Sequence, residues 1–225
     1  MLVIAKYKYL IFVYPFVWKQ NKRTIMEKTT IVNKRFESSK GYVDSLSDQY
    51  SKLNMVRIDL GYGKDENEKV DITLEEANQD LNRMLNNRRS KPSIFKDQVG
   101  YIIKKEYTKD KGVHLHALFI FNGQNVKKAS YKAKQIGEYW NELTQEHNGN
   151  NHSCHYKEYK EHGIDMLDYR DTDKREILDK NVLTYLCKDD KKQDIKAIQG
   201  DKRVKAFIRG TIPKSKSNMG RPREQ

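Results

Sequence analysis

The sequence predicts an α+β fold, in which helices pack on a central and mainly antiparallel sheet. Two apolar segments, Gln98–Thr108 and Val113–Gly123, are joined by the polar turn "KDKG", which is typical of an antiparallel hairpin. The predicted elements follow the order strand, helix, strand, strand, helix, strand, helix, strand, and this order favours an α+β domain. A chain of 225 residues is long enough to bury one sizeable core.

The first predicted strand is Lys52–Gly63, where "KLNMVRIDLGYG" alternates between polar and apolar residues. A short helix or loop near Gly41–Tyr50 precedes it. A helix is predicted over Thr73–Arg89, because Thr73 and Glu76 form a capping box and apolar residues then recur at helical spacing.

The second half of the chain follows the same logic. Lys127–Glu146 has apolar residues at helical spacing, and the segment "NGNNHSCH" ends this helix. A strand or a loop is expected at His155–Tyr169, a helix at Thr172–Asp190, and a last strand within Arg203–Pro213. We expect residues 41–212 to form one domain, preceded by a partly ordered basic extension, 1–40, and followed by a flexible basic tail, 213–225.

The positive charge is concentrated at the two ends of the chain. Residues 1–40 hold nine basic and two acidic residues, and residues 203–225 hold seven and one, so the ends supply +7 and +6 of the net charge of +13. The middle therefore sums to zero. Such a balance predicts a polyanionic partner such as nucleic acid. It fits equally well with basic tails that aid solubility or bind nucleic acid without sequence preference.

The two cysteines and the apolar N-terminal run indicate a cytoplasmic protein without a membrane partner. Cys154 and Cys187 form no CxxC pair and no disulfide framework, which suits a reducing compartment. The run Tyr9–Trp18 is ten residues long and contains Pro15, so it is too short to span a bilayer. "KQNKR" follows it instead of a small-residue cleavage site, and we expect no targeting role.

Glu106, His114 and His116 are the candidate metal ligands. Residues two apart on a strand share a face, so the two histidines point the same way. Pairing of Glu106 with either histidine places its carboxylate on their face, whereas pairing with Leu115 places it on the other; a turn through Asp110–Gly112 gives the first register. One carboxylate and two imidazoles with open coordination positions suit Mn²⁺ or Mg²⁺. The alternative is a pair of hydrogen-bonded core histidines.

A second group of residues offers ligand types suited to zinc, but its spacing matches no common zinc module and it lies in an Asn- and Gly-rich segment. We treat it as the weaker metal candidate. Its members are His147, His152, Cys154, His155 and His162.

At these residues the chain resembles the HUH endonucleases, the rolling-circle initiators and relaxases. The likeness is to inovirus-type gene-two replication proteins of phages and prophages, over about Leu53 to Arg223. It is carried, in order, by "RMLNNRRSK", "VGYIIKKEYTKDKGVHLHALFIFNG", "IGEYWNELT", "DMLDYRD", "YLCKDD" and "FIRG…GRPR". The resemblance implies an HUH/RRM-like antiparallel sheet with the histidine strand at its centre. It also implies cleavage of single-stranded DNA by a tyrosine that stays joined to the 5′ phosphate.

The resemblance implies a role for five residues. Glu106, His114 and His116 match the metal ligands, Tyr185 matches the nucleophile, and Lys188 matches the lysine three residues after it. This chain has one tyrosine at the motif, and members with two complete the strand transfer differently.

The Y-x-x-K pattern alone does not select Tyr185. It also occurs at Tyr101–Lys104 and at Tyr131–Lys134. The odd position of Tyr101 puts it on the strand face opposite Glu106, so Tyr131 is the alternative nucleophile. On the residues alone, Tyr185 could also be a packing residue of its helix.

Several basic residues are candidate nucleic-acid contacts. Arg57, on the first strand, is placed two residues before Asp59, so a salt bridge between them is the competing interpretation. A basic cluster at the end of the first helix could contact phosphates or be a solvated helix end. The candidates are Arg57, Arg88, Arg89, Lys91 and Arg209.

The sequence thus leads to one main hypothesis and two rivals. The main hypothesis is a metal-dependent DNA nickase and ligase that starts rolling-circle replication of a phage or mobile element. Its expected substrate is a single-stranded or supercoiled DNA origin. A host helicase or polymerase is the expected further partner, and no small-molecule cofactor is expected. The rivals are a non-catalytic DNA-binding regulator of the same fold and a cellular metal-dependent hydrolase.

Overall fold

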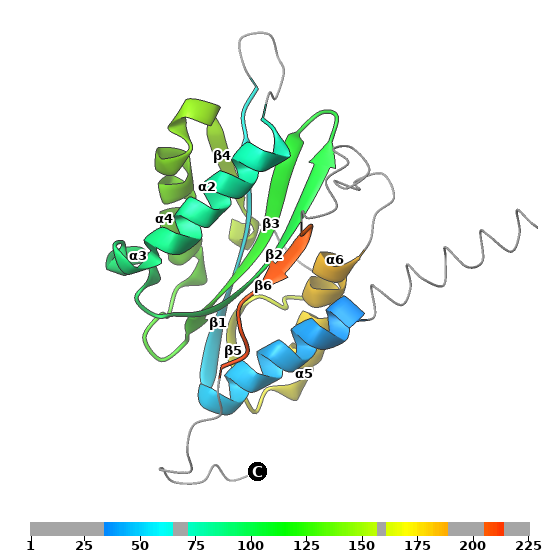
Figure 1. The fold of residues 1–225 in the computed structure, drawn as a ribbon. Helices are drawn as coiled ribbons and strands as arrows, with labels where there is room; N and C mark the ends of the chain where they lie inside the picture. Colours follow the sequence, from blue (N-terminus) through cyan, green and yellow to red (C-terminus); the bar gives the residue numbers. More distant parts are fainter. Residues whose placement is uncertain (1–33, 65–71, 157–160, 189–204, 214–225) are drawn as a thin grey trace, which may run out of the picture.

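A computed structural model describes residues 34–64, 72–156, 161–188 and 205–213. Six strands form one antiparallel sheet in the order β4-β1-β3-β2-β6, and β5 also pairs with β1 (Figure 1). The predicted α+β class is confirmed. The strands are β1 (Lys52–Tyr62), β2 (Gln98–Thr108), β3 (Gly112–Asn122), β4 (Gly149–Ser153), β5 (Asp165–Asp168) and β6 (Phe207–Arg209).

Several helices are short, and several are followed by turns that are tighter or wider than those of an α-helix. They are a helix at 34–49, α2 (Leu74–Asn86), α3 (Pro92–Phe95), α4 (Ala129–Leu143), α5 (Thr172–Ile177) and α6 (Thr184–Cys187). Three 3₁₀ turns accompany them, η1 (Asn87–Arg89), η2 (Gln145–His147) and η3 (Cys154–Tyr156), and a π-helical turn, η4 (Leu178–Leu183), joins α5 to α6.

The β2–β3 hairpin forms the middle of the sheet. Its turn returns through Gly112, whose φ of 59° is a left-handed conformation that glycine adopts readily. The strands are then paired with Glu106 opposite His114 and Lys104 opposite His116. β3 is buried along nearly its whole length because β1 pairs with its other edge and helices cover both of its faces.

Helices cover the two faces of the sheet unequally (Figure 1). α2, α3 and α4 pack on one face, where residues such as Phe119, Phe121 and Trp140 are buried. The helix at 34–49 and the α5–η4–α6 segment pack on the other face, against Leu118 and Ile120. The even-numbered residues of β2 and β3 point to this second face, and so do the candidate metal ligands.

Three elements differ from the sequence predictions. β4 lies in the segment "NGNNHSCH", which we predicted only as the end of a helix. The helix predicted at Thr172–Asp190 is divided by η4 and ends at Cys187, with its last two predicted residues outside the described ranges. The helix at 34–49 contains the predicted boundary between residues 40 and 41, and it contributes Tyr42 and Leu46 to the core.

The capping box of the predicted helix Thr73–Arg89 is confirmed at the start of α2. Both cysteines are buried and unbridged. In the ranges that the structure describes, no helix has the length and apolar character needed to cross a membrane. The apolar run Tyr9–Trp18 and most of the two basic ends fall outside these ranges.

Candidate metal centre

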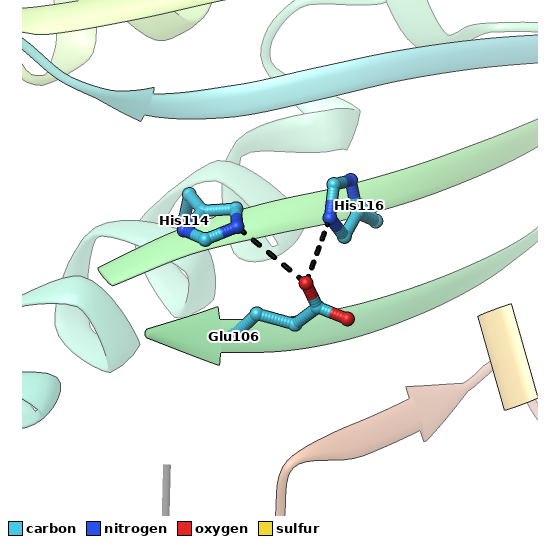
Figure 2. A group of neighbouring side chains, drawn as sticks. All are labelled: Glu106, His114 and His116. Atoms are coloured by element: carbon cyan, nitrogen blue, oxygen red, sulfur yellow. Dashed lines mark hydrogen bonds and ion pairs between the residues drawn. The ribbon is translucent and has the colours of Figure 1, made fainter. Parts of the chain in front are cut away.

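Glu106, His114 and His116 converge at the end of the β2–β3 hairpin (Figure 2). The Nε2 atom of His116 lies 3.0 Å from Oε2 of Glu106, and Nε2 of His114 lies 3.5 Å from the same oxygen. All three side chains are buried, and their ligand atoms lie within 4.8 Å of one another. The even register that the sequence analysis favoured is therefore confirmed, and among the described residues this is the one group of three that could hold a metal ion.

The second nitrogen of each ring fixes the orientation of the first. Nδ1 of His116 is 2.6 Å from Oδ1 of Asp59, and Nδ1 of His114 is 3.1 Å from the carbonyl oxygen of Gly112. Each Nδ1 can therefore donate its proton to an oxygen, which directs Nε2 at Glu106, where it can bind a cation once it has lost its own proton. Metal-binding histidines are commonly oriented by such a carboxylate or carbonyl partner. The donor set thus fits a divalent cation held by two Nε2 atoms and Oε2.

The carboxylate of Glu106 is kept ionised by its neighbours. Burial alone would raise its pKa, but hydrogen bonds from His114, His116 and Lys104 lower the pKa well below the ordinary value. Lys104 forms an ion pair with Oε1, the oxygen that does not face the rings. The same groups act on His116: burial would lower its pKa, whereas the hydrogen bonds with Asp59 and Glu106 raise it. A cation bound here would replace the proton that these carboxylates attract.

Tyr185, on α6, is the tyrosine that reaches this centre. Its hydroxyl oxygen lies 3.4 Å from Nε2 of His116, and the two rings meet edge to face with centroids 5.4 Å apart. Tyr185 is 47% exposed, so the residue is accessible from solvent while its hydroxyl contacts the buried histidine. Burial and the charge of Glu106 raise the pKa of Tyr185, and the positive charge of Arg57 opposes this shift.

Two cations flank the Tyr185 ring. Cζ of Arg57 is 5.8 Å and Nζ of Lys104 is 6.0 Å from the ring centroid. Arg57 also forms the ion pair with Asp59 that the sequence analysis gave as the competing interpretation, so it joins the site through Asp59 and Tyr185 together. Sequence reasoning missed Lys104 at the site, although its even position on β2 places it on the face of Glu106.

Lys188, which the resemblance pairs with Tyr185, lies at the end of the tyrosine helix. It is exposed at the C-cap of α6, where the backbone leaves the helix, and its N–H bonds back to Thr184 and Tyr185. The residue three positions after Tyr185 would share a helix face with it only if the helix continued through that position. A second lysine, Lys104 from β2, lies beside the tyrosine ring.

Tyr131 and most of the predicted nucleic-acid contacts lie away from the metal centre. Tyr131 is exposed on α4, across the sheet from the histidines, which removes the geometric basis for its role as the alternative nucleophile. On that same side Arg88 stacks on Tyr101, Arg89 is exposed, and Lys91 pairs with Glu142. Arg209 lies on the site face, but its guanidinium bonds to Ser38 and to Gly210 and covers the Tyr42 ring.

The weaker metal candidate does not assemble. His147 bonds to Asp80 beside Tyr62, on the α2–α4 side of the sheet. His155 accepts a hydrogen bond from the backbone of Arg57, and both His155 and His162 lie against Asp165. His152 is exposed on β4, and Cys154 is buried. The partners of His147, His155 and His162 are carboxylates and backbone rather than one another.

The fold and the site together define an α+β protein with a buried Glu-His-His group that can hold a metal ion beneath an accessible tyrosine. The profile of the YagK/YfjJ C-terminal domain matches residues 17–205. The chain therefore belongs to the YagK/YfjJ C-terminal domain family. Neither a curated protein nor a solved structure matches it.

Proposed function

We propose that the protein is a metal-dependent enzyme that nicks and rejoins single-stranded DNA through a covalent 5′-phosphotyrosine on Tyr185. One observation carries the proposal: the Tyr185 hydroxyl lies 3.4 Å from Nε2 of His116, beside the three groups that can bind a cation. A nucleophile and a metal that act on one phosphate must lie this close together. The resemblance to HUH endonucleases supports the same assignment of Glu106, His114, His116 and Tyr185.

The reaction exchanges one phosphodiester for another. The Tyr185 oxygen attacks the scissile phosphorus and loses its proton as the O–P bond forms, and the bond to the 3′ oxygen breaks as that oxygen gains a proton. A divalent cation held by Glu106 and the two histidines would supply polarisation of the phosphate and neutralisation of developing charge. Arg57 and Lys104, beside the tyrosine ring, add positive charge where the phenolate forms.

The phosphotyrosine conserves the energy of the broken bond. Attack by a 3′ hydroxyl reverses the step and releases Tyr185, so no external energy source is required. A protein with this activity can expose a primer end at a replication origin and later reseal it. We therefore infer a role in rolling-circle replication of a phage or mobile element, with an origin DNA, single-stranded or supercoiled, as the substrate and a host helicase or polymerase as later partners.

A covalent-adduct assay tests this function. The full chain is incubated with labelled single-stranded DNA and Mn²⁺, and adducts that resist denaturation are counted by electrophoresis. We expect an adduct from the wild type, none from Tyr185→Phe or His114→Ala, and a normal yield from Tyr131→Phe, the matched tyrosine on the opposite side of the sheet.

The same assay separates the rival functions. Retention of DNA without any adduct would favour a non-catalytic DNA-binding regulator. Metal-dependent cleavage that survives Tyr185→Phe would favour a hydrolase that does not use the tyrosine. An adduct that persists in Tyr185→Phe would contradict the assignment of the nucleophile.

A further inference from the structure

We propose that the outward face of β4, together with Gly61, is the track on which single-stranded DNA lies next to the metal centre, with Asn150 and His152 as its contacts. This inference rests on the proposed function and adds the path of the substrate to it. Neither residue was expected to contact DNA, and His152 was considered only as a zinc ligand.

The sheet register places both residues in line with the site. On β1, Asp59 is opposite His116 of β3 on one edge and opposite His152 of β4 on the other. Directly opposed residues of an antiparallel pair share a face, so His152 faces the same side as His116. Gly61 is opposite Asn150 by the same pairing. With strands about 4.8 Å apart, β4 is about 10 Å from β3, close enough for one strand of DNA to contact both.

Alternation along β4 confirms which side chains face outward. Asn151, between the two, points the other way and donates a hydrogen bond of 3.1 Å to Asn141 on α4. Asn150 and His152 are both exposed, whereas the neighbouring Asp59 and His116 are engaged with each other. Thus β4 presents an amide and an imidazole beside the buried ligands.

Gly61 lies between Asn150 of β4 and His114 of β3, and its lack of a side chain allows them to come close to each other. A Cβ atom at this position would lie 3.1 Å from Oδ1 of Asn150 and 3.6 Å from Cβ of His114. A glycine inside a strand weakens the strand, and one of its common reasons is the close approach of a ligand. The missing side chain lets the Asn150 amide approach His114 across β1, so a scissile phosphate held at the ligand atoms would lie next to Asn150.

The remainder of this face is already covered. The helix at 34–49 packs Tyr42 and Leu46 over the far part of β2, next to Gly100. Leu118 and Ile120 of β3 are fully buried there, and Arg209 of β6 is bonded to Ser38. A DNA strand that leaves the metal centre therefore meets protein in that direction and an exposed surface over β4.

The chemistry of the track suits an unpaired nucleotide. The amide of Asn150 can donate to and accept from a base edge, and the His152 ring can stack on a base. Both need a base released from its duplex partner, as in a single strand. The carboxylate nearest the track, Asp59, is neutralised by Arg57 and His116, so it opposes a polyanion little.

Binding measurements on the full chain test the track. The probe is a fluorescein-labelled single-stranded oligonucleotide of randomised sequence, titrated by anisotropy without Mn²⁺ so that no cleavage occurs. We expect the double variant Asn150→Ala, His152→Ala to weaken its binding about tenfold, as loss of one stacked base does. Gly61→Val should weaken it similarly by displacing the Asn150 side chain. Gln145→Ala, an exposed amide at the end of α4 on the other side of the sheet, is the matched control and should bind as the wild type does.

The affinity for Mn²⁺, measured by calorimetry, shows whether the variants keep the site. An unchanged Mn²⁺ affinity with weakened DNA binding supports the track, whereas equal DNA affinity in the wild type and the double variant overturns it. Failure of the proposed function looks different: the wild type then forms no adduct, while its DNA binding still depends on Asn150 and His152 if the track is correct.

Discussion

Asp59 connects the candidate metal centre to Arg57, one of the two cations beside the Tyr185 ring. Burial alone would raise the pKa of its carboxyl, but the hydrogen bond from His116 and the charge of Arg57 lower the pKa to about 2. The carboxylate is therefore charged at any working pH. As an acceptor for Nδ1 of His116, it turns Nε2 toward Glu106.

Removal of Asp59 should weaken metal binding although Asp59 is not itself among the three ligands. We expect Asp59→Ala to reduce the affinity for Mn²⁺ about 10- to 100-fold, which is the usual effect of losing the partner that orients a metal-bound histidine. Calorimetric titration measures it. Asp48→Ala, an exposed aspartate on the helix at 34–49, is the control for lost charge. Equal affinities in the two variants would show that the orientation of His116 does not depend on Asp59.

Lys105 is a buried lysine on the opposite face of the same strand. Its ammonium bonds to Asn78, and burial lowers its pKa from 10.5 to about 8. Between these two values the unfolded chain binds the proton that the folded chain has released, so stability rises with pH across this window. Below about pH 8 the folded protein carries the full cost of a desolvated charge.

Lys105→Met should therefore stabilise the protein near neutral pH. The lowering of the Lys105 pKa corresponds to about 3 kcal/mol. Loss of the hydrogen bond to Asn78 offsets about 1 kcal/mol of this. The expected gain in free energy of unfolding is therefore about 2 kcal/mol. Urea denaturation at about pH 7 and about pH 10 measures it, and the gain should shrink at the higher pH. The exposed Lys111→Met is the control. A gain that is the same at both pH values would assign it to packing instead of charge.

At the scale of single residues, strand parity made most of the metal centre predictable. The even positions of Glu106, His114 and His116 sufficed once the hairpin was recognised. Parity also applied to Lys104, but the resemblance directed attention to Lys188, which lies where α6 ends. Asp59 could not be placed opposite His116 from sequence, because that pairing depends on the register of β1 against β3.

The π-helical turn η4 is the element that positions the tyrosine. The N–H of Thr184 bonds to the carbonyl oxygen of Asp179, five residues earlier, and its hydroxyl bonds to the same oxygen at 3.0 Å. A π turn holds one residue more than an α turn and is often found at functional sites. Because each helical residue turns about 100°, this extra residue changes the direction of Tyr185 relative to α5 by about that angle.

Deletion of Lys180, an exposed residue of η4, tests this role. We expect the wide turn to become an α turn and Tyr185 to rotate away from His116, so that adduct formation is lost. The affinity for Mn²⁺ should remain, because its three ligands are on β2 and β3. Lys180→Ala keeps the residue count and should form the adduct normally. Adduct formation at the wild-type rate in the deletion variant would contradict the proposed role.

The elements that sequence missed have weak local signals. β4 reads "GNNHS", which contains no β-branched or aromatic residue, and it becomes a strand because the edge of β1 offers it backbone partners. Helical periodicity does not reveal the turn η4, because the spacing of its apolar residues also fits one long α-helix. The long elements α2, β2, β3 and α4, by contrast, have clear caps or periodicity and lie where they were predicted.

At the scale of the whole molecule, the net charge of +13 comes from the ends, while the candidate metal centre lies in the electrically balanced middle. Contacts between basic residues and phosphates raise the affinity for DNA, and this contribution decreases as the salt concentration rises. The reaction at one phosphate depends instead on the local geometry of the site. Affinity and catalysis should therefore respond to different substitutions.

Neutralising the C-terminal tail should change the salt dependence of DNA binding and leave the bond-forming step intact. With the basic residues Lys214, Lys216, Arg221 and Arg223 replaced by serine, we expect the slope of log K against log salt to fall by up to about 3, since each phosphate contact on a single strand contributes about 0.7. The rate of adduct formation at saturating DNA should equal that of the wild type, because Tyr185 and its neighbours are unchanged.

A matched set separates the position of the charge from its amount. Four exposed basic residues on the α2–α4 side carry the same total charge and lie across the sheet from the metal centre: Arg89, Lys96, Lys128 and Lys134. Their replacement by serine should alter the slope little, because counterions are released only where cations meet phosphates. An equal fall in slope for both sets would contradict contact by the tail, because binding would then depend on the net charge of the molecule and not on where that charge lies.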